Sequence, residues 1–176
     1  DLTSLVKVCG TYKLVYDGNE YYVSMPNVYK TAEFENTYTY TGNDLGATWS
    51  SSATNFRVWA PTAEKVQVQL YATGSDSESG SKKLGTHTMT KDSKGTWVAK
   101  VSGDLNGVYY TYLVTVNGKT VEACDPYART TGVNGNRAMV LNMDSTDPKG
   151  WGSDVSPNKG MTYTDAEGNE QTPIMG

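Results

Sequence analysis

Apolar and polar side chains alternate with a period of two residues along much of this chain. Between Asn55 and Pro61 the apolar positions are Phe56, Val58 and Ala60. Between Glu64 and Tyr71 they are Val66, Val68 and Leu70. This alternation is typical of half-buried β-strands, and Pro61 ends the first one because proline has no N–H to donate to a ladder. We predict two consecutive strands that share one core, with Trp59 packed against a neighbouring part of the protein.

The same alternation recurs between turn signals in other parts of the chain. Val108 to Val116 is the longest segment, and the Asn117-Gly118 pair that follows it is typical of a type I′ hairpin turn. Asp17-Gly18-Asn19 is a second turn signal between two apolar segments. Further strands are expected at 5–8, 11–16, 20–25, 47–49, 86–90, 97–101, 119–122 and 138–141, with a short one at 161–164. Short strands at a spacing of about ten residues predict an all-β protein with a β-sandwich fold.

The pattern divides the chain into three regions. Residues 1–35 are expected to form a hairpin, with a short turn or helix after Pro26, and either pack on the next region or are the remnant of a preceding domain. Residues 36–147 are expected to form the sandwich, which includes a solvated Ser/Gly-rich loop at 73–83. Residues 148–176 read as a linker and a polar tail.

Composition and charge narrow the partner classes. The 13 Tyr, 4 Trp and 18 Gly residues of the 176-residue chain fit pleated strands and turns. A formal net charge of −4 argues against a nucleic-acid partner, which usually requires a basic patch, and no apolar stretch is long enough to span a membrane. A chain that begins at Asp1 without Met or a signal peptide looks processed or excised. The composition is typical of secreted or cell-surface bacterial proteins that act on carbohydrates.

The cysteines and the acidic residues give little support to a catalytic or metal site. Cys9 and Cys124 are compatible with one disulfide or with two buried thiols. We read His87, the only histidine, as an exposed strand residue. Four aspartates occupy turn contexts, in which Asp bonds its own backbone, so catalysis is not expected of Asp44, Asp92, Asp104 and Asp125. No cofactor is predicted. Ca²⁺ takes oxygen ligands, so a calcium site could be formed by Asp144, Asp147 and Asp154. We favour the interpretation that these three residues are ordinary acidic residues of turns and of the linker.

Exposed aromatic rings are the remaining candidates for a binding function. Sugar rings stack on aromatic faces because their axial C–H groups match the negative face of the π-system. The candidates are Trp49, Tyr71, Trp97 and Tyr109. The alternative interpretation makes Trp97 a core residue and Tyr109 a solvent-facing sheet residue.

Several segments, in the same order, resemble the N-terminal module of type I pullulanases, which is a carbohydrate-binding module of family 48. These segments span about residues 36–151 and are 40–47, 56–63, 95–97, 103–112, 125–128 and 132–135. The resemblance implies an immunoglobulin-like β-sandwich, here with an additional N-terminal β-hairpin. It also implies a non-catalytic module ahead of an α-amylase-type barrel that would be its neighbour in a debranching enzyme. Residues 161–166 resemble the approach to the first strand of that barrel.

The resemblance also implies where a glucan would bind. In glycogen-binding relatives two tryptophans, a lysine and an asparagine hold the sugar. The asparagine position matches Asn136, the lysine position falls at Leu113 and one tryptophan position at Glu122, while the second tryptophan position falls in the 73–83 loop, which has no aromatic residue. Together with the aromatic candidates, the predicted carbohydrate-binding residues are Asn136, Leu113, Tyr109, Trp49 and Glu122.

Three functions remain open on the sequence. The first is a module that binds starch, glycogen, pullulan or maltooligosaccharides. The second is a β-sandwich that supports a catalytic barrel without binding sugar. It is motivated by the three sugar-binding positions at which this chain lacks the residue found in the glycogen-binding relatives. The third is an immunoglobulin-like module for a protein partner. Catalysis by this chain alone is not expected.

Overall fold

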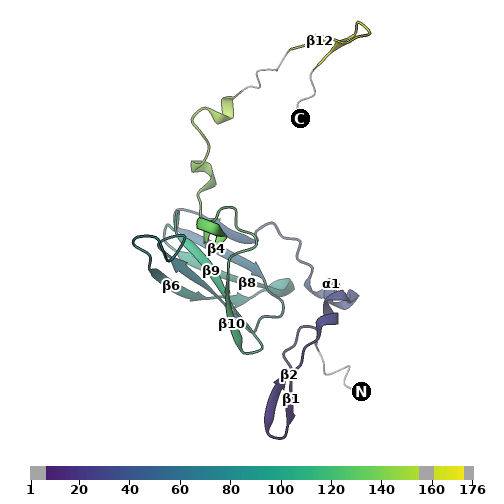
Figure 1. Ribbon diagram of the computed structural model, residues 1–176, viewed down its shortest axis with the longest axis vertical. Helices are drawn as coiled ribbons and strands as arrows, with labels where there is room; N and C mark the ends of the chain where they lie inside the picture. Colours follow the sequence, from purple (N-terminus) through teal and green to yellow (C-terminus); the bar gives the residue numbers. More distant parts are fainter. Residues whose placement is uncertain (1–6, 155–160, 173–176) are drawn as a thin grey trace. The chain divides into compact units, whose positions relative to one another are not determined.

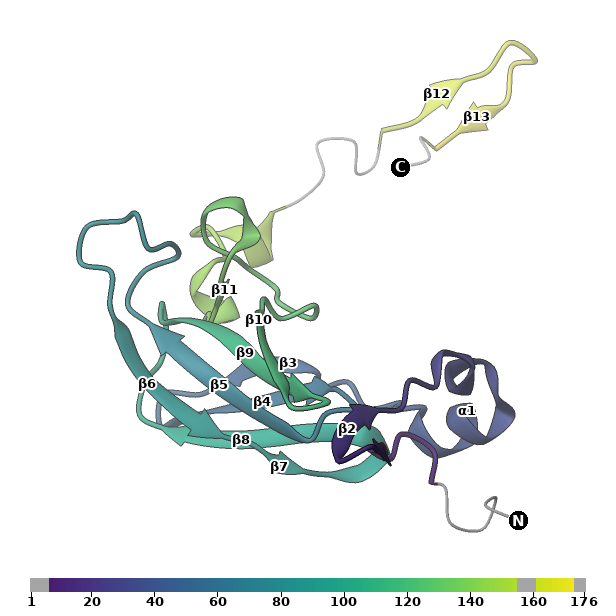
Figure 2. The same ribbon diagram turned by 60° about the horizontal axis from the view of Figure 1, so that its bottom comes forward.

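The computed structural model describes residues 7–154 and 161–172 (Figure 1). The chain forms two units, residues 1–142 and residues 143–176. The first unit contains a two-sheet sandwich preceded by a hairpin and a short helical region (Figures 1 and 2). None of the helices in the described ranges is long and apolar enough to cross a membrane.

Two antiparallel sheets make the sandwich. One has the strand order β3-β4-β8-β7, with the bounds Gly46–Trp49, Ala53–Trp59, Thr96–Ser102 and Thr90–Lys91. The other has the order β10-β9-β5-β6, with the bounds Lys119–Ala123, Tyr109–Val116, Lys65–Tyr71 and Lys83–Thr88. A short strand, β11 (Ala138–Met139), also pairs with β9. The prediction of an all-β sandwich is confirmed.

The core lies between the two sheets, where the period-two pattern placed it. Both sheets contribute buried side chains, including Phe56, Val58, Trp97, Val66, Val68, Leu70, Tyr110 and Tyr112. The rings of Phe56 and Tyr110 meet edge to face with centroids 5.0 Å apart. Trp97 is therefore a core residue, as its alternative interpretation held. Asn117 and Gly118 both have positive φ, which confirms the hairpin turn between β9 and β10.

The N-terminal region packs a helix on the outer side of the first sheet. The hairpin of β1 (Lys13–Tyr16) and β2 (Asn19–Tyr22) precedes the 3-10 helix η1 (Pro26–Lys30) and the helix α1 (Ala32–Tyr38). Phe34 of α1 is buried and meets the ring of Trp59 edge to face at 6.1 Å. The indole Nε1 of Trp59 donates to the carbonyl of Tyr38 at 2.8 Å. The prediction that Trp59 packs against a neighbouring part is confirmed.

Several local expectations were wrong. The strand expected at 86–90 divides at Met89, which is buried in the core and carries the chain from β6 in one sheet to β7 in the other. His87 is half-buried rather than exposed, because it lies opposite Val68 on the inner side of the edge strand β6. Residues 5–6 of the strand expected at 5–8 lie outside the described residues, and Lys7 and Val8 are not in a strand.

The second unit, residues 143–176, consists of short elements. It contains η4 (Met143–Ser145), η5 (Trp151–Ser153) and a hairpin of β12 (Tyr163–Thr164) and β13 (Glu170–Gln171). The strand expected at 161–164 thus has a partner that the sequence pattern did not reveal. The region boundaries predicted near residues 36 and 148 stay a prediction.

Candidate carbohydrate-binding groove

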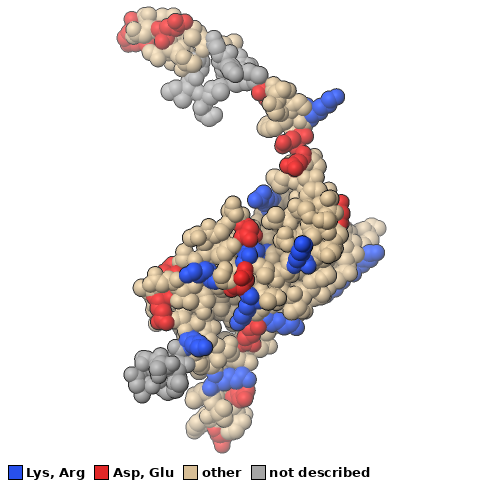
Figure 3. All heavy atoms as spheres, turned by 180° about the vertical axis from the view of Figure 1, so that it is seen from behind, with Lys and Arg blue, Asp and Glu red and all other residues tan. Residues whose placement is uncertain are grey.

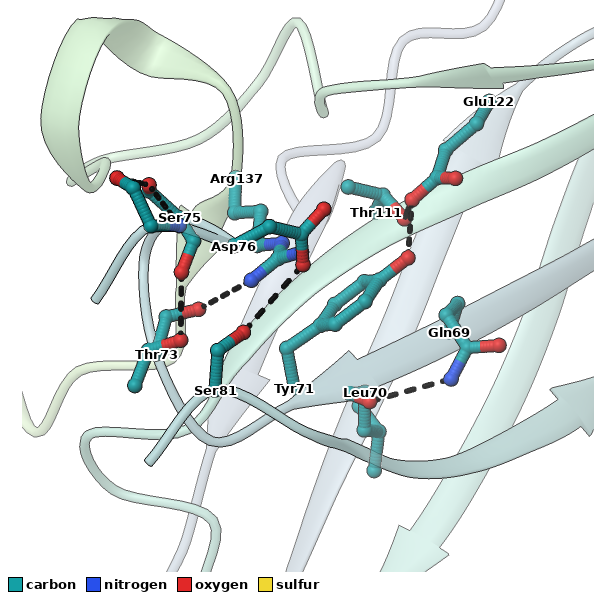
Figure 4. Close-up of polar contacts among 11 residues, drawn as sticks. Gln69, Leu70, Tyr71, Thr73, Ser75, Asp76, Ser81, Thr111, Glu122 and Arg137 are labelled. Atoms are coloured by element: carbon teal, nitrogen blue, oxygen red, sulfur yellow. Dashed lines mark hydrogen bonds and ion pairs between the residues drawn. The ribbon is translucent and has the colours of Figure 1, made fainter. Parts of the chain in front are cut away.

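A groove of about 490 Å³ lies on the outer side of the second sheet. Strands β5, β9 and β10, the 73–83 loop and the segment before β11 line it. Its lining residues are Tyr71, Ser75, Asp76, Ser77, Lys83, Thr111, Glu122, Ala123, Cys124, Asn136 and Arg137. Charged and hydroxyl side chains dominate this lining, so the groove offers both hydrogen-bond donors and hydrogen-bond acceptors. Figure 4 shows the side chains of its central part.

Strand register explains why these side chains share one face. Tyr71 of β5 lies opposite Tyr109 of β9, and Leu113 of β9 lies opposite Glu122 of β10. Residues directly opposite each other in an antiparallel pair point to the same side of the sheet, and residues two apart in one strand do so as well. Thr111, between Tyr109 and Leu113, therefore belongs to the same face. The alternate residues of these strands fill the core.

Glu122 accepts two hydrogen bonds at the centre of the groove. The hydroxyl of Tyr71 and the Oγ1 of Thr111, the latter at 2.7 Å, both donate to its Oε1 (Figure 4). Burial, and after it the hydrogen bond to this carboxylate, raises the pKa of Tyr71 to about 12. The Oε2 of Glu122 has no donor among the described residues. A sugar hydroxyl could donate to this oxygen without breaking the network.

Arg137 covers the ring of Tyr71 and fixes the neighbouring loop. Its guanidinium carbon lies 3.6 Å from the ring centroid, in cation–π geometry. The same guanidinium donates to the carbonyl of Thr73 at 2.9 Å and forms an ion pair with Asp76. The hydrogen bond from Arg137, and then its charge, lower the pKa of the Asp76 carboxyl. The aromatic face of Tyr71 is thus occupied by a side chain of the protein itself.

The structure brings together four of the five predicted carbohydrate-binding residues. Asn136 is exposed and lines the groove, as Glu122 does, and Leu113 is half-buried on the sheet face that carries Glu122. Tyr109 is half-buried on this face beneath the backbone of Gly74. Trp49 instead belongs to the other sheet. It packs against the core, and its Nε1 donates to Asp104 at 2.8 Å.

Sequence reasoning missed Arg137 and Asp76. Thr111 could have been predicted, because the period-two pattern of β9 places it on the same face as Tyr109. Arg137 carries no such signal, since it stands in an irregular segment whose path over β5 depends on tertiary packing. Asp76 belongs to a loop that composition described only as flexible. Their pairing across 61 residues of sequence is visible only in the structure.

The remaining acidic candidates have structural contacts. Asp44 and Asp92 both form ion pairs with Arg57, at 2.8 Å and 2.6 Å. Asp125 accepts from the backbone N–H of Tyr127, which confirms the predicted turn contact, and it is also buried and accepts hydrogen bonds from Tyr110 and Tyr112 in the core, which the sequence did not indicate. Within the described ranges, no three His, Cys, Asp or Glu side chains form a group that could hold a metal, and this includes Asp144, Asp147 and Asp154.

Lysine and arginine side chains are interspersed with aspartate and glutamate on the face shown in Figure 3.

Cys9 and Cys124 are free and half-buried, so the structure corresponds to the two-thiol alternative. Burial raises the pKa of both thiols, which keeps them in the less reactive protonated form.

Comparison with known proteins assigns a family to the sandwich. Residues 44–128 match the model of carbohydrate-binding module 48, the isoamylase N-terminal domain. A pullulanase of Bacillus subtilis is 36% identical over 117 residues, which cover 66% of this chain and 15% of that protein. A pullulanase of Klebsiella pneumoniae is 34% identical over 129 residues, which cover 68% of this chain and 11% of that protein.

Solved structures agree with this assignment. Pullulanase from Paenibacillus barengoltzii, in complex with maltohexaose and α-cyclodextrin, has a TM-score of 0.65 and 42% identity over 72% of this chain and 19% of that one. Pullulanase from Anoxybacillus sp. LM18-11 has a TM-score of 0.70 and 34% identity over 81% of this chain and 20% of that one. The chain therefore spans a fifth or less of the length of these relatives.

Proposed function

We propose, because residues 44–128 form a non-catalytic carbohydrate-binding module of family 48, that this chain binds α-glucans as part of a secreted debranching enzyme. The ligands would be starch, glycogen, pullulan or maltooligosaccharides, and the groove on the β10-β9-β5-β6 sheet would hold them. An adjacent catalytic barrel of the parent enzyme would be the second partner. The pullulanase relatives support this parentage.

One observation carries the proposal. Leu113 and Glu122, at two family-site positions, lie opposite each other on one face of the sheet, and Asn136, at a third position just before β11, lines the same groove as Glu122. The amide of Asn136 and the free oxygen of Glu122 are suited to hydrogen bonds with sugar hydroxyls. The lysine and serine side chains at the rim add further donors.

The second candidate function is a structural one, in which the sandwich supports the catalytic barrel and binds no sugar. Arg137 favours it, because its guanidinium covers the ring of Tyr71, an aromatic residue that lines the groove. Glu122 also stands where the resemblance places a tryptophan. If this function is correct, deletion of the module should lower the thermal stability of the parent enzyme, while the isolated chain should show no glucan affinity.

Affinity electrophoresis separates the two functions. The chain is run in native gels with and without amylopectin, beside the variants Asn136→Ala and Asn55→Ala. Asn55 is an exposed asparagine of β4 on the other sheet and serves as the matched control. We expect the wild type and Asn55→Ala to be retarded equally. Asn136→Ala should bind about five-fold more weakly, as expected for the loss of about 1 kcal/mol of hydrogen bonding.

Two results would contradict the proposal. Equal mobility of the wild-type chain in both gels would remove glucan binding and leave the structural function. Retardation that is unchanged in Asn136→Ala would show that sugar binds, but at a surface other than this groove.

A further inference from the structure

The loop from Thr73 to Ser81, called the lid loop here, lines part of the groove through Ser75, Asp76 and Ser77. Gly74 meets Gly132 through backbone atoms alone, and a Cβ added at Gly74 would lie 2.9 Å from the Cα of Gly132. The same Cβ would lie 2.9 Å from the Cε1 of Tyr109, so the lid loop rests directly on this ring. Asp76 of this loop pairs with Arg137 (Figure 4).

Two aromatic rings lie beneath the lid loop and Arg137, which together are called the cover here. Tyr71 and Tyr109 are directly opposite each other on adjacent strands, on the same outer face of the sheet. Only 2% of Tyr71 is exposed, although an outer-face residue of a sandwich would normally meet solvent. Arg137 contributes to this burial, because its planar guanidinium lies over the ring, in the position in which a sugar ring would stack. The structure thus contains a two-tyrosine platform that the protein itself covers.

The ion pair that closes the cover meets solvent on one side. The Asp76 side chain that pairs with Arg137 is 88% exposed, whereas the Arg137 side chain is only 6% exposed, so water and salt reach the pair from the Asp76 side and screen it there. Most of the other side-chain hydrogen bonds of the loop run within it, for example between Ser75 and Ser77 at 2.6 Å. The Oε1 of Glu78 is buried with no hydrogen-bond partner among the described residues. An unsatisfied buried oxygen disfavours the closed arrangement, and opening of the loop would restore its hydration.

We propose that the lid loop and Arg137 form a self-occluding cover over a Tyr71–Tyr109 stacking platform, and that α-glucans bind this platform when the Arg137–Asp76 pair opens. This inference rests on the proposed glucan-binding function and adds a regulated aromatic subsite to it. Release from Asp76 frees the guanidinium to leave the ring of Tyr71 and to donate to sugar hydroxyls at the rim. Glucan affinity is then reduced by the fraction of molecules in which the cover is closed.

Two independent substitutions test the cover. Asp76→Asn removes the charge that holds Arg137, and Asp92→Asn is its control, because Asp92 pairs with Arg57 on the other sheet. Gly74→Ala inserts a methyl group between the lid loop and Gly132 without removing a charge. Gly152→Ala is its control, because a Cβ at Gly152 meets no atom within 4 Å.

Hydrogen–deuterium exchange of residues 73–81 and calorimetric titration with maltoheptaose are the two measurements. We expect Asp76→Asn and Gly74→Ala to exchange faster than wild type in this loop. Asp76→Asn should bind about two- to five-fold more tightly, the factor that corresponds to loss of an ion pair screened by solvent at its Asp76 side. Addition of Tyr109→Ala to Asp76→Asn should abolish this gain, because one ring of the platform is then missing. Both control variants should behave as wild type.

The outcomes separate this inference from the proposed function. Wild-type binding with unchanged affinity in both test variants would overturn the cover and leave the groove as the glucan site. Absence of wild-type binding with measurable binding in the variants would support the cover and contradict the resting groove as a site. Faster exchange without any binding in any variant would overturn the platform, and unchanged exchange in both variants would overturn the lid.

Discussion

Replacement of Asp125 by alanine tests whether the hydrogen bonds of this buried carboxylate hold the segment that leads to the groove. Asp125 is only 4% exposed, and its carboxylate stands at the start of the irregular segment that leads to Asn136 and Arg137. Its Oδ2 accepts from the hydroxyl of Tyr110 at 2.7 Å and from that of Tyr112 at 3.2 Å. Its Oδ1 accepts from the backbone N–H of Tyr127 at 2.8 Å. Asp125→Ala therefore leaves three donors without an acceptor.

The magnitude follows from these contacts. Each buried donor left unsatisfied costs about 1–3 kcal/mol, so three of them cost about 3–9 kcal/mol. Removal of the carboxylate also relieves the cost of its desolvation, which amounts to several kcal/mol and offsets part of the loss. We expect Asp125→Ala to lower the free energy of unfolding by about 2–4 kcal/mol. Asp125→Asn should cost less, because its amide oxygen still serves Tyr127 and the two hydroxyls can accept from its NH₂ group.

Urea unfolding followed by tryptophan fluorescence measures this loss, with Asp147→Ala at an exposed position as the control. The pH dependence adds a second signature. Burial raises the pKa of Asp125, so the folded state binds its proton more tightly than the unfolded state. The stabilisation from this proton is present below the ordinary aspartate pKa of about 4 and is lost as pH rises through the folded pKa. The stability of wild type relative to Asp125→Asn should therefore increase as pH falls from neutrality toward about 4.

Two results would refute this reasoning. An unchanged urea midpoint in Asp125→Ala would show that the three hydrogen bonds contribute no net stability. A wild-type stability that decreases relative to Asp125→Asn on acidification would show that the folded state favours the ionised carboxylate.

Two further predictions concern Trp59 and Tyr71. Trp59→Ala removes the ring on which Phe34 packs, so it should lower the free energy of unfolding by about 1–3 kcal/mol and speed amide exchange in α1, whereas the 61% exposed Trp151 should tolerate alanine. A loss of stability without faster exchange in α1 would contradict the docking role. Tyr71 has a pKa raised to about 12, so the stability it contributes is present below about pH 10 and is lost between about pH 10 and 12. Tyr71→Phe should flatten this part of the alkaline unfolding profile, and an unchanged profile would show that Tyr71 ionises equally in both states.

The alternation of apolar residues determined most of the fold. Phe56 and Val58 in one strand and Val66 and Val68 in the next could be assigned to the core, because strand geometry places every second side chain on one face. Turn chemistry fixed the β9–β10 hairpin at Asn117-Gly118 for a similarly local reason, since few residues accept positive φ. The family signature around Phe56 follows from the same segments. These features depend on near neighbours in sequence, and a single sequence is enough to read them.

Tertiary structure decided which side chains occupy the candidate groove. The sequence placed Asn136 and Glu122 at family positions, but it gave no indication that Arg137 would stack on Tyr71 or that Asp76 would hold it there. Met89 likewise carries the chain between sheets because core packing, not alternation, decides its position. Such contacts join residues far apart in the chain, and their geometry depends on how irregular loops settle on the finished sandwich. Local pattern therefore specified the scaffold, while long-range packing determined which side chains occupy its outer face.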